Sequence, residues 1–255
     1  MNPRPARSIT VRPRPIMVEP GRGADPCSTC GARGNSVCDA IGDEDLERLA
    51  TVAIVTDVEP GKTFIHEGDS ADNFFNITSG TAKLYKLLPD GRRQITGFAR
   101  AGVFLGLAVS STYAFSAEAI DRVRFCRFPR PKLQALLEDF PAMEKRLLET
   151  ASNELVAAQE QMLLLGRKTA RERVASFLIA QGLLSLPCRH AHDEIALPMS
   201  RGDIADYLGL TIETVSRTFT RLKNEQLIAI PTATAVSVLD RAGLLSLAEG
   251  YESDN

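Results

Sequence analysis

The stretch Ser200–Arg217, S-R-G-D-I-A-D-Y-L-G-L-T-I-E-T-V-S-R, decides the fold of the C-terminal third of this 255-residue chain. Ser200 and Asp203 have the spacing of a capping box, which predicts a helix that begins after Ser200. Gly209 follows that helix where the chain needs a left-handed turn residue, and Thr211 is placed to cap a second helix. Two short helices joined by a tight turn are typical of a helix-turn-helix.

The second predicted helix has an apolar face and a polar face. Its apolar residues repeat at helical spacing and are expected to be buried: Ile212, Val215, Phe219 and Leu222. The other face carries Glu213, Ser216, Arg217 and Thr220. An arginine fork bonds guanine and a carboxylate accepts from cytosine N4, so this face has the chemistry of a recognition helix.

The remaining DNA contacts are assigned by residue type and position. Arg221 and Lys223 fit contacts to phosphate groups, and we assign Thr211 and Arg201 to the same DNA-binding set. The chain as a whole has a net charge of -2, so a DNA-binding surface must gather its basic residues locally. Between Arg167 and Lys223 there are nine Lys and Arg residues against six Asp and Glu residues.

Outward from this motif, the sequence predicts a helix over residues 170–184 and β structure over residues 227–239. Together with the helix-turn-helix, these elements make a winged helix. Upstream, residues 52–128 contain β-rich runs separated by glycine turns at Gly61, Gly68, Gly80, Gly91 and Gly102. Evenly spaced short strands with no intervening helices indicate a β-sandwich or β-roll.

A long helix is predicted from Pro141 to Lys168. Its apolar residues follow steps of three and four, as in a coiled-coil seam: Leu148, Ala151, Leu155, Ala158, Met162 and Leu165. No charged residue interrupts this seam. We interpret it as the interface of a homodimer rather than as a face packed on its own domain.

Four cysteines are candidate metal ligands. Cys27, Cys30 and Cys38 lie within twelve residues of one another in a Gly/Ser-containing loop, and Cys126 lies alone in a β-rich run. Four thiolates can hold either a tetrahedral zinc ion or an iron–sulfur cluster, and the residues alone leave both open. Cys126 could also be a small buried apolar residue. We interpret Cys188, beside His190 and His192, as part of a surface loop.

Several classes of protein are disfavoured. Paired catalytic carboxylates, a nucleophile elbow and a P-loop are absent from the sequence, and C-S-T-C lacks the βαβ context of a dithiol oxidoreductase. We therefore expect no enzyme. No apolar run approaches the roughly 18 residues of a membrane span, and five prolines in the first 22 residues argue against a transit helix. We expect a cytoplasmic protein with a disordered basic arm.

The stretch Ser200–Arg217, the block G-R-R-Q-I-T-G-F (Gly91–Phe98) and the cysteine arrangement resemble the CRP/FNR superfamily of bacterial transcription regulators. The likeness covers residues 26–245 and is greatest to the FNR branch, of the FnrL, FnrN and AadR type. It implies a 4Fe-4S cluster on Cys27, Cys30, Cys38 and Cys126 that responds to oxygen and controls anaerobic or microaerobic gene expression.

The resemblance also implies an α+β architecture. An antiparallel, cyclic-nucleotide-binding-like β-roll would be followed by a dimerisation helix and a C-terminal winged helix-turn-helix. The predicted segments are an arm (1–25), a cysteine loop (26–40), the β-roll (41–140), the dimerisation helix (141–168), the DNA-binding domain (169–246) and a tail (247–255). The seam has Ala158 where some members of that family carry an acidic residue that weakens association, so we expect oxygen to act on dimer geometry, with monomer–dimer exchange as the alternative.

The expected partners follow from the same resemblance. They are palindromic double-stranded DNA with TTGAT half-sites about one helical turn, ~34 Å, apart, a second copy of the chain, and RNA polymerase through the hairpin that contains G-R-R-Q. Two alternatives remain. One is a zinc-based or thiol-redox regulator. The other, a cyclic-nucleotide sensor, is disfavoured because a phosphate cassette needs a Glu and an Arg-Ser pair. The matching stretch A-G-V-F-L-G-L-A (101–108) lacks the Glu, and Phe115 stands before Ser116 in place of the Arg.

Overall fold

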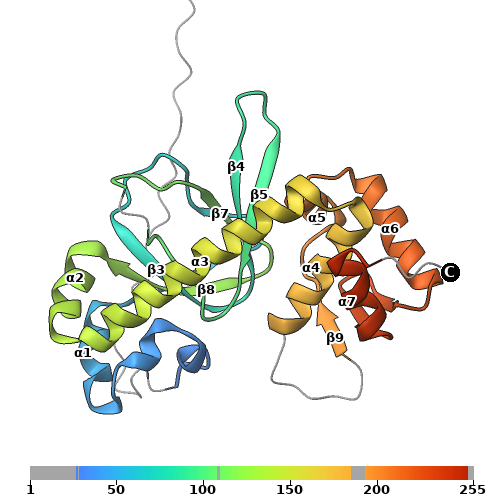
Figure 1. The fold of residues 1–255 in the computed structure, drawn as a ribbon. Helices are drawn as coiled ribbons and strands as arrows, with labels where there is room; N and C mark the ends of the chain where they lie inside the picture. Colours follow the sequence, from blue (N-terminus) through green and yellow to red (C-terminus); the bar gives the residue numbers. More distant parts are fainter. Residues whose placement is uncertain (1–26, 28, 108–109, 185–192, 252–255) are drawn as a thin grey trace, which may run out of the picture.

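The computed structural model of the chain describes residue 27 and residues 29–107, 110–184 and 193–251. The arm predicted for residues 1–25 and the predicted loop containing Cys188 lie outside these described residues. A long helix, α3 (Pro141–Arg167), runs from a lobe that holds most of the strands to a lobe built mainly of helices (Figure 1). Among the described helices, none combines the length and apolar character that a bilayer crossing requires.

Two four-stranded antiparallel sheets form the first lobe, as predicted for a β-roll, with orders β1-β8-β3-β6 and β2-β7-β4-β5. The strands are β1 (Ile54–Val58), β2 (Thr63–Ile65), β3 (Asn73–Ser79), β4 (Ala82–Leu87), β5 (Arg93–Ala99), β6 (Phe104–Leu105), β7 (Ser116–Ala119) and β8 (Val123–Pro129). The five predicted turn glycines all have positive φ. Space also excludes a side chain at Gly80, where a Cβ would lie 2.3 Å from the carbonyl oxygen of Arg122.

Short helical elements flank the sheets. They are the 3-10 turns η1 (Arg33–Asn35), η2 (Val37–Ala40) and η3 (Asp43–Asp45), and the helices α1 (Leu46–Val52) and α2 (Arg130–Asp139). The short helix predicted near residues 43–49 is therefore η3 followed by α1. The cysteine loop predicted for residues 26–40 contains two 3-10 turns, because the Ser36 hydroxyl accepts a hydrogen bond from the backbone N–H of Cys38 and starts η2.

Strand β3 separates two apolar cores in this lobe, since alternate side chains of a strand point to opposite faces. Phe74 belongs to one core and Phe75 and Ile77 to the other. The first is here named the cysteine core and consists of Val37, Cys38, Ile41, Leu46, Leu49, Phe74, Phe104, Phe128, Leu133, Leu136, Met143 and Leu147. The second, the roll core, lies between the sheets and includes Phe75, Ile77 and Phe125.

The second lobe is a winged helix. Its helices are α4 (Ala170–Leu184), α5 (Arg201–Leu208), α6 (Ile212–Asn224) and α7 (Arg241–Glu249), and its sheet has the order β10-β11-β9, with β9 (Asp193–Ala196), β10 (Ile228–Thr232) and β11 (Ala235–Val238). The predicted capping is confirmed. The Ser200 hydroxyl accepts from the backbone N–H of Asp203, Gly209 has φ 63°, and Thr211 caps α6.

Three features of this lobe differ from the sequence prediction. Strand β9 adds a third strand to the wing. Helix α7 crosses the boundary placed at residue 246, and Leu247 and Ala248 are buried in the core of the lobe. Ile212 was expected in the buried stripe but is 53% exposed. It occupies the first position of α6, at the end of the apolar stripe, where it lies near Gly202 of α5.

The β4–β5 hairpin joins the two lobes through ionic contacts to α5, here named the junction. Lys83 of β4 places its Nζ 3.0 Å from both Asp203 and Glu118. Arg93 of β5 binds Asp203 at 3.0 Å and Asp206 at 2.8 Å. Asp203 also accepts hydrogen bonds from Ser200. One buried carboxylate therefore caps α5 and holds the hairpin.

The charge state of Asp203 follows from these partners. Burial opposes its ionisation, but hydrogen bonds from Ser200 and Lys83 outweigh that effect, so the pKa of the carboxyl lies below its ordinary value. The stabilisation that ionised Asp203 contributes is thus fully present at neutral pH. It is lost only as the pH falls below the unfolded-state value of about 3.9 and through the lower folded-state pKa.

Replacing Asp203 with Asn should destabilise the protein by about 2 kcal/mol, the size of one hydrogen bond between a charged pair. The amide keeps the size of the carboxylate but leaves the buried ammonium of Lys83 with Glu118 alone. Urea unfolding at pH 7 measures the change. The matched control is Asp90→Asn, which removes an exposed ion pair with Arg92 and should leave the unfolding midpoint unchanged. Equal effects of the two substitutions would contradict the prediction.

Candidate cysteine centre, helix seam and DNA-reading face

Three of the four candidate cysteines lie on one folded segment. The backbone N–H of Cys30 donates to the carbonyl of Cys27 at 3.3 Å, and the N–H of Arg33 donates to that of Cys30 at 3.1 Å. The Arg33 guanidinium reaches across the segment to the carbonyl of Ile41 at 2.7 Å. These bonds give the segment a defined shape that brings Cys38 into the cysteine core.

Cys126 comes from β8, where it pairs with Val55 of β1 and Asn76 of β3. The sequence left the face of Cys126 open, and the structure assigns it to the side of the cysteine core. Cys27 and Cys126 are both partly buried and pack against that core, and Cys38 is buried within it. The distant cysteine and the N-terminal segment are therefore brought together.

Burial and mutual repulsion act on these thiols. Burial, followed by the charges of Cys27, Cys38 and Cys30, raises the pKa of the Cys126 thiol to about 12. Burial also raises the pKa of Cys38, with Cys30 adding to the rise and Ser36 opposing it. Thiols must lose their protons to bind a metal. Within the described parts of the chain, no three His, Cys, Asp or Glu side chains are arranged to hold one metal ion.

The segment that contains Cys27, Cys30 and Cys38, here named the cysteine segment, packs directly against α3. Val37 and Ile41, which flank Cys38, share the cysteine core with Met143 and Leu147 from the first half of α3. Met143 is fully buried there. A change in the shape of the cysteine segment therefore moves side chains that contact the long helix.

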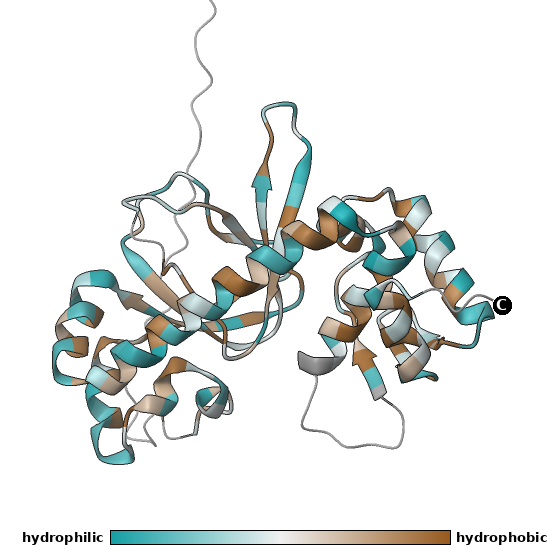
Figure 2. Cartoon of the chain, in the orientation of Figure 1, coloured by the Kyte–Doolittle hydropathy of each residue, from teal (hydrophilic) through white to brown (hydrophobic). Residues whose placement is uncertain are grey.

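The predicted apolar seam on α3 is largely exposed in the single chain. Leu148, Leu155 and Met162 are 69%, 61% and 68% exposed, and apolar patches recur along α3 in Figure 2. Ala158 is also exposed, whereas Ala151 is half-buried. Leu165 differs because it packs against the core of the winged helix. Two further exposed apolar residues, Val156 and Leu163, were not predicted to belong to this surface.

Helix α6 presents the predicted reading face. Glu213, Ser216, Arg217 and Thr220 are exposed, as is the capping residue Thr211. The opposite face, with Val215, Phe219 and Leu222, is buried, and Thr218 lies with it because its hydroxyl donates to the carbonyl of Thr214 at 2.8 Å.

The carboxylate of Glu213 is held ready to accept hydrogen bonds. Its own backbone N–H, then the Thr211 hydroxyl and the nearby Arg217, lower the pKa of Glu213. It is therefore ionised at neutral pH, which suits an acceptor for cytosine N4.

Two predicted DNA contacts are already engaged within the chain. The Arg201 guanidinium lies 3.6 Å from the centre of the Phe219 ring, and burial lowers its pKa. Arg221 binds Glu225 at 2.9 Å, and Arg171 binds the same carboxylate. Arg201 therefore joins α5 to α6 as well as standing at the start of α5.

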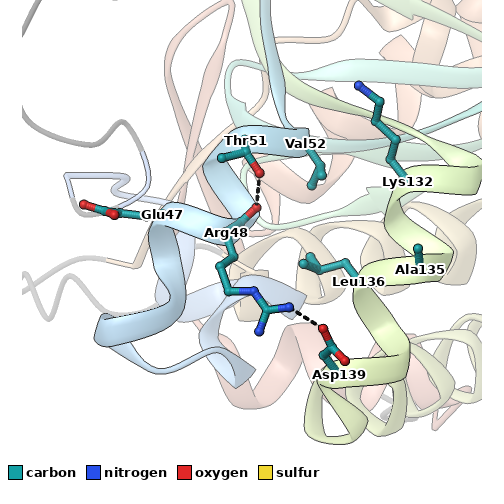
Figure 3. Close-up of a pocket in the computed structure, with 8 residues that line it drawn as sticks. All are labelled: Glu47, Arg48, Thr51, Val52, Lys132, Ala135, Leu136 and Asp139. Carbon is teal, nitrogen blue, oxygen red and sulfur yellow. Dashed lines mark hydrogen bonds and ion pairs between the residues drawn. The ribbon is translucent and has the colours of Figure 1, made fainter.

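One surface groove of about 490 Å³ lies between α1 and α2, away from the candidate residues (Figure 3). It is lined by Glu47, Arg48, Thr51, Val52, Lys132, Ala135, Leu136 and Asp139. An ion pair between Arg48 and Asp139 crosses it. None of the predicted site residues lines this groove.

Comparison with known proteins gives consistent matches. Residues 172–247 match the Crp-like helix-turn-helix domain family and residues 55–140 match the cyclic nucleotide-binding domain family. The chain is 42% identical to the nitrogen fixation regulation protein FixK of Bradyrhizobium diazoefficiens, over 93% of this chain and 99% of that protein. It is 45% identical to the transcriptional activatory protein AadR of Rhodopseudomonas palustris, over 84% and 90%. The structure of FixK2 from Bradyrhizobium japonicum matches with a TM-score of 0.72 and 35% identity, over 77% and 97%.

Replacing Leu155 with Glu should raise the dissociation constant of a dimer at least tenfold, about 1.4 kcal/mol, because a charge would enter the centre of the apolar seam. Light scattering over a concentration series measures the change. Asn153→Glu is the matched control, since Asn153 is exposed on α3 and lies two residues, roughly 200°, around the helix from Leu155. A dimer that tolerates Leu155→Glu as well as the control would exclude this seam as the interface.

Proposed function

We propose that this chain, which belongs to the FNR branch of the CRP/FNR family of DNA-binding transcription regulators, senses oxygen through a 4Fe-4S cluster and thereby controls anaerobic or microaerobic genes. One observation carries the proposal. Thiols from the N-terminal segment and from β8 gather at a single apolar core, and that core includes residues of the helix that bears the exposed seam.

The donor set is the first support. Cys27, Cys30, Cys38 and Cys126 would supply four sulfur ligands, the number and type that an iron–sulfur cluster takes. When bound, a 4Fe-4S cluster supplies an oxygen-sensitive cross-link between the N-terminal segment and the β-roll. Partial burial of Cys27 and Cys126 limits the access of water to the sulfurs.

The route to DNA uses the chain's own packing. Val37 and Ile41 hold the cysteine segment against Met143 and Leu147 of α3. Further along α3, Gln161 donates to the carbonyl of Tyr207 on α5 at 2.9 Å, and Leu164 is buried in the core of the winged helix. Helix α3 thus carries the exposed seam and contacts both the cysteine segment and the DNA-reading lobe. A shift of α3 would therefore change the distance between the two α6 helices of a dimer.

Recognition is assigned to α6. Glu213, Ser216 and Arg217 would read bases of TTGAT-type half-sites in two successive turns of the major groove, ~34 Å apart. Contact with RNA polymerase through the β4–β5 hairpin is part of the proposal. Arg93 is engaged at the junction. Arg92 forms an ion pair with Asp90 but its side chain is 75% exposed, so Arg92 is the arginine of G-R-R-Q that a partner could reach.

Two alternative functions make different demands on the residues described above. A zinc-based regulator would employ the same four thiols and is tested by the metal content below. A cyclic-nucleotide sensor would need a cationic anion site near Ser116. The Ser116 hydroxyl accepts from the backbone N–H of Glu67 at 3.0 Å, and its neighbour Phe115, which packs against the roll core, supplies no cation for a phosphate.

Replacing Cys126 with Ala should reduce bound iron from about four atoms per protomer to near zero, because one of four ligands is lost. Iron, sulfide and zinc are measured on protein purified under argon. Cys188→Ala is the control, since Cys188 is outside the proposed ligand set, and should retain its iron. Colourless wild-type protein with stoichiometric zinc would favour the zinc alternative. Unchanged iron in Cys126→Ala would remove Cys126 from the ligands.

Replacing Arg217 with Ala should weaken operator binding by ~1–3 kcal/mol and reduce the preference for guanine, as expected for loss of a bidentate base contact. Lys223→Ala, which removes an exposed cation from the same helix, should weaken all sequences equally and reduce the salt slope by about 1. Binding to operator and point-mutant operators is measured by anisotropy at several salt concentrations. Retained guanine preference in Arg217→Ala would place the reading contact elsewhere.

A further inference from the structure

Asn76 is a buried amide in the middle of strand β3. It lies in β3 within the run N-F-F-N-I, and only 1% of its surface is exposed. Its neighbours in the run, Phe75 and Ile77, face the roll core. Asn76 faces the opposite way, toward the cysteine core, where Ser36 beside Cys38 is another buried polar residue.

Two of the candidate cysteine ligands lie next to the Asn76 amide. In the sheet register Asn76 stands opposite Cys126 of β8. Its Nδ2 donates a hydrogen bond to the Sγ of Cys38 at 3.6 Å. Asn76 therefore lies between the sulfur-bearing residue of the N-terminal segment and the sulfur-bearing residue of the β-roll.

The buried amide of Asn76 lowers the stability of the fold. Its Oδ1 is buried and has no hydrogen-bond partner among the described residues, and an unsatisfied buried polar group costs roughly 1–3 kcal/mol. An apolar side chain of similar size would avoid that cost and pack with the phenylalanines. Fold stability thus gives no reason for an amide at this position.

The hydroxyl of Ser36, which also lies near Cys38, has a different role from the Asn76 amide. The hydroxyl of Ser36 donates its one proton to the carbonyl of Arg33 at 3.1 Å and accepts from the backbone N–H of Cys38 at 3.2 Å. It fixes the backbone of η2. The Asn76 amide is directed at the sulfur itself, and it comes from a rigid central strand of the sheet rather than from the cysteine segment.

We infer that Asn76 is a positioning residue that holds the Cys38 sulfur toward β8 and donates an N–H···S hydrogen bond to it when it serves as a thiolate ligand. The inference rests on the proposed function. Hydrogen bonds to ligating sulfurs stabilise negative charge on them and are among the determinants of the reduction potential of an iron–sulfur cluster. The amide of Asn76 thus tunes both the retention and the potential of the bound group.

The test compares three variants under argon. Asn76→Leu removes the donor at similar volume. Asn76→Asp keeps the shape but turns an oxygen, which cannot donate when ionised, toward the sulfur. Phe75→Leu is the matched control, because Phe75 is the next residue of the same strand and is 5% exposed in the roll core. Measured are iron and sulfide content, the rate of iron loss to a chelator, the midpoint potential, and urea unfolding of the apoprotein.

Asn76→Leu should lose iron to the chelator roughly tenfold faster than wild type, as is typical when a partner of a ligand is removed, and its midpoint potential should be more negative. Its apoprotein should be at least as stable as wild type. Asn76→Asp should change retention and potential in the same direction and further. Phe75→Leu should lower the stability of the fold while leaving the midpoint potential unchanged.

Iron loss and potential in Asn76→Leu equal to those of wild type would overturn the inference while leaving the proposed function intact. The inference would also be overturned if Phe75→Leu shifted the potential as much, since that would show a general effect of weakened packing. Wild-type protein with neither iron nor sulfide would overturn the proposed function and this inference together.

Discussion

The contact between the cysteine segment and α3 is the constraint on which the rest of the structure depends. Val37 and Ile41 bury their side chains in a core that includes Met143 and Leu147, and Cys38 is buried in the same core. Four thiols on an isolated loop would be only a binding site. Because Cys38 lies in a core with residues of the helix that carries the exposed seam, and Cys27 and Cys126 pack against that core, the arrangement of these thiols and the position of the helix depend on each other through close packing.

A second contact fixes the other end of the helix. Leu164 is buried in the core of the winged helix, and Gln161 bonds to Tyr207 of α5. The hairpin from the β-roll reaches α5 independently through Asp203. The DNA-reading lobe is therefore held by both apolar and polar contacts, and the exposed residues Leu148 and Leu155 lie along α3 between Leu147, which packs in the cysteine core, and Gln161. Figure 1 shows α3 running from one lobe to the other.

Local rules predicted much of this from sequence. The capping box at Ser200, the turn at Gly209 and the five turn glycines of the β-roll are determined by neighbours a few residues away, and the structure confirms them. The features that the sequence did not predict depend on partners far away in the sequence. Strand β9 is four residues long, and only β11 makes it a strand. Nothing near Lys83 in the sequence reveals that its ammonium is buried against α5. Asn76 resembles the polar half of an alternating strand, and its role depends on a residue 38 positions away.

The junction also limits how such proteins can be rebuilt. Asp203 belongs to the helix-turn-helix, yet two of its cationic partners, Lys83 and Arg93, belong to the β-roll. A chimera that took its DNA-reading domain from one regulator and its sensor from another would bring together a carboxylate and a hairpin that had not been matched. The buried Lys83 would then keep only Glu118, which belongs to its own lobe, and Arg93 would lose Asp203. Swapping specificity between such regulators therefore requires transplanting the hairpin strands along with the helices, or limiting the exchange to the outer face of α6.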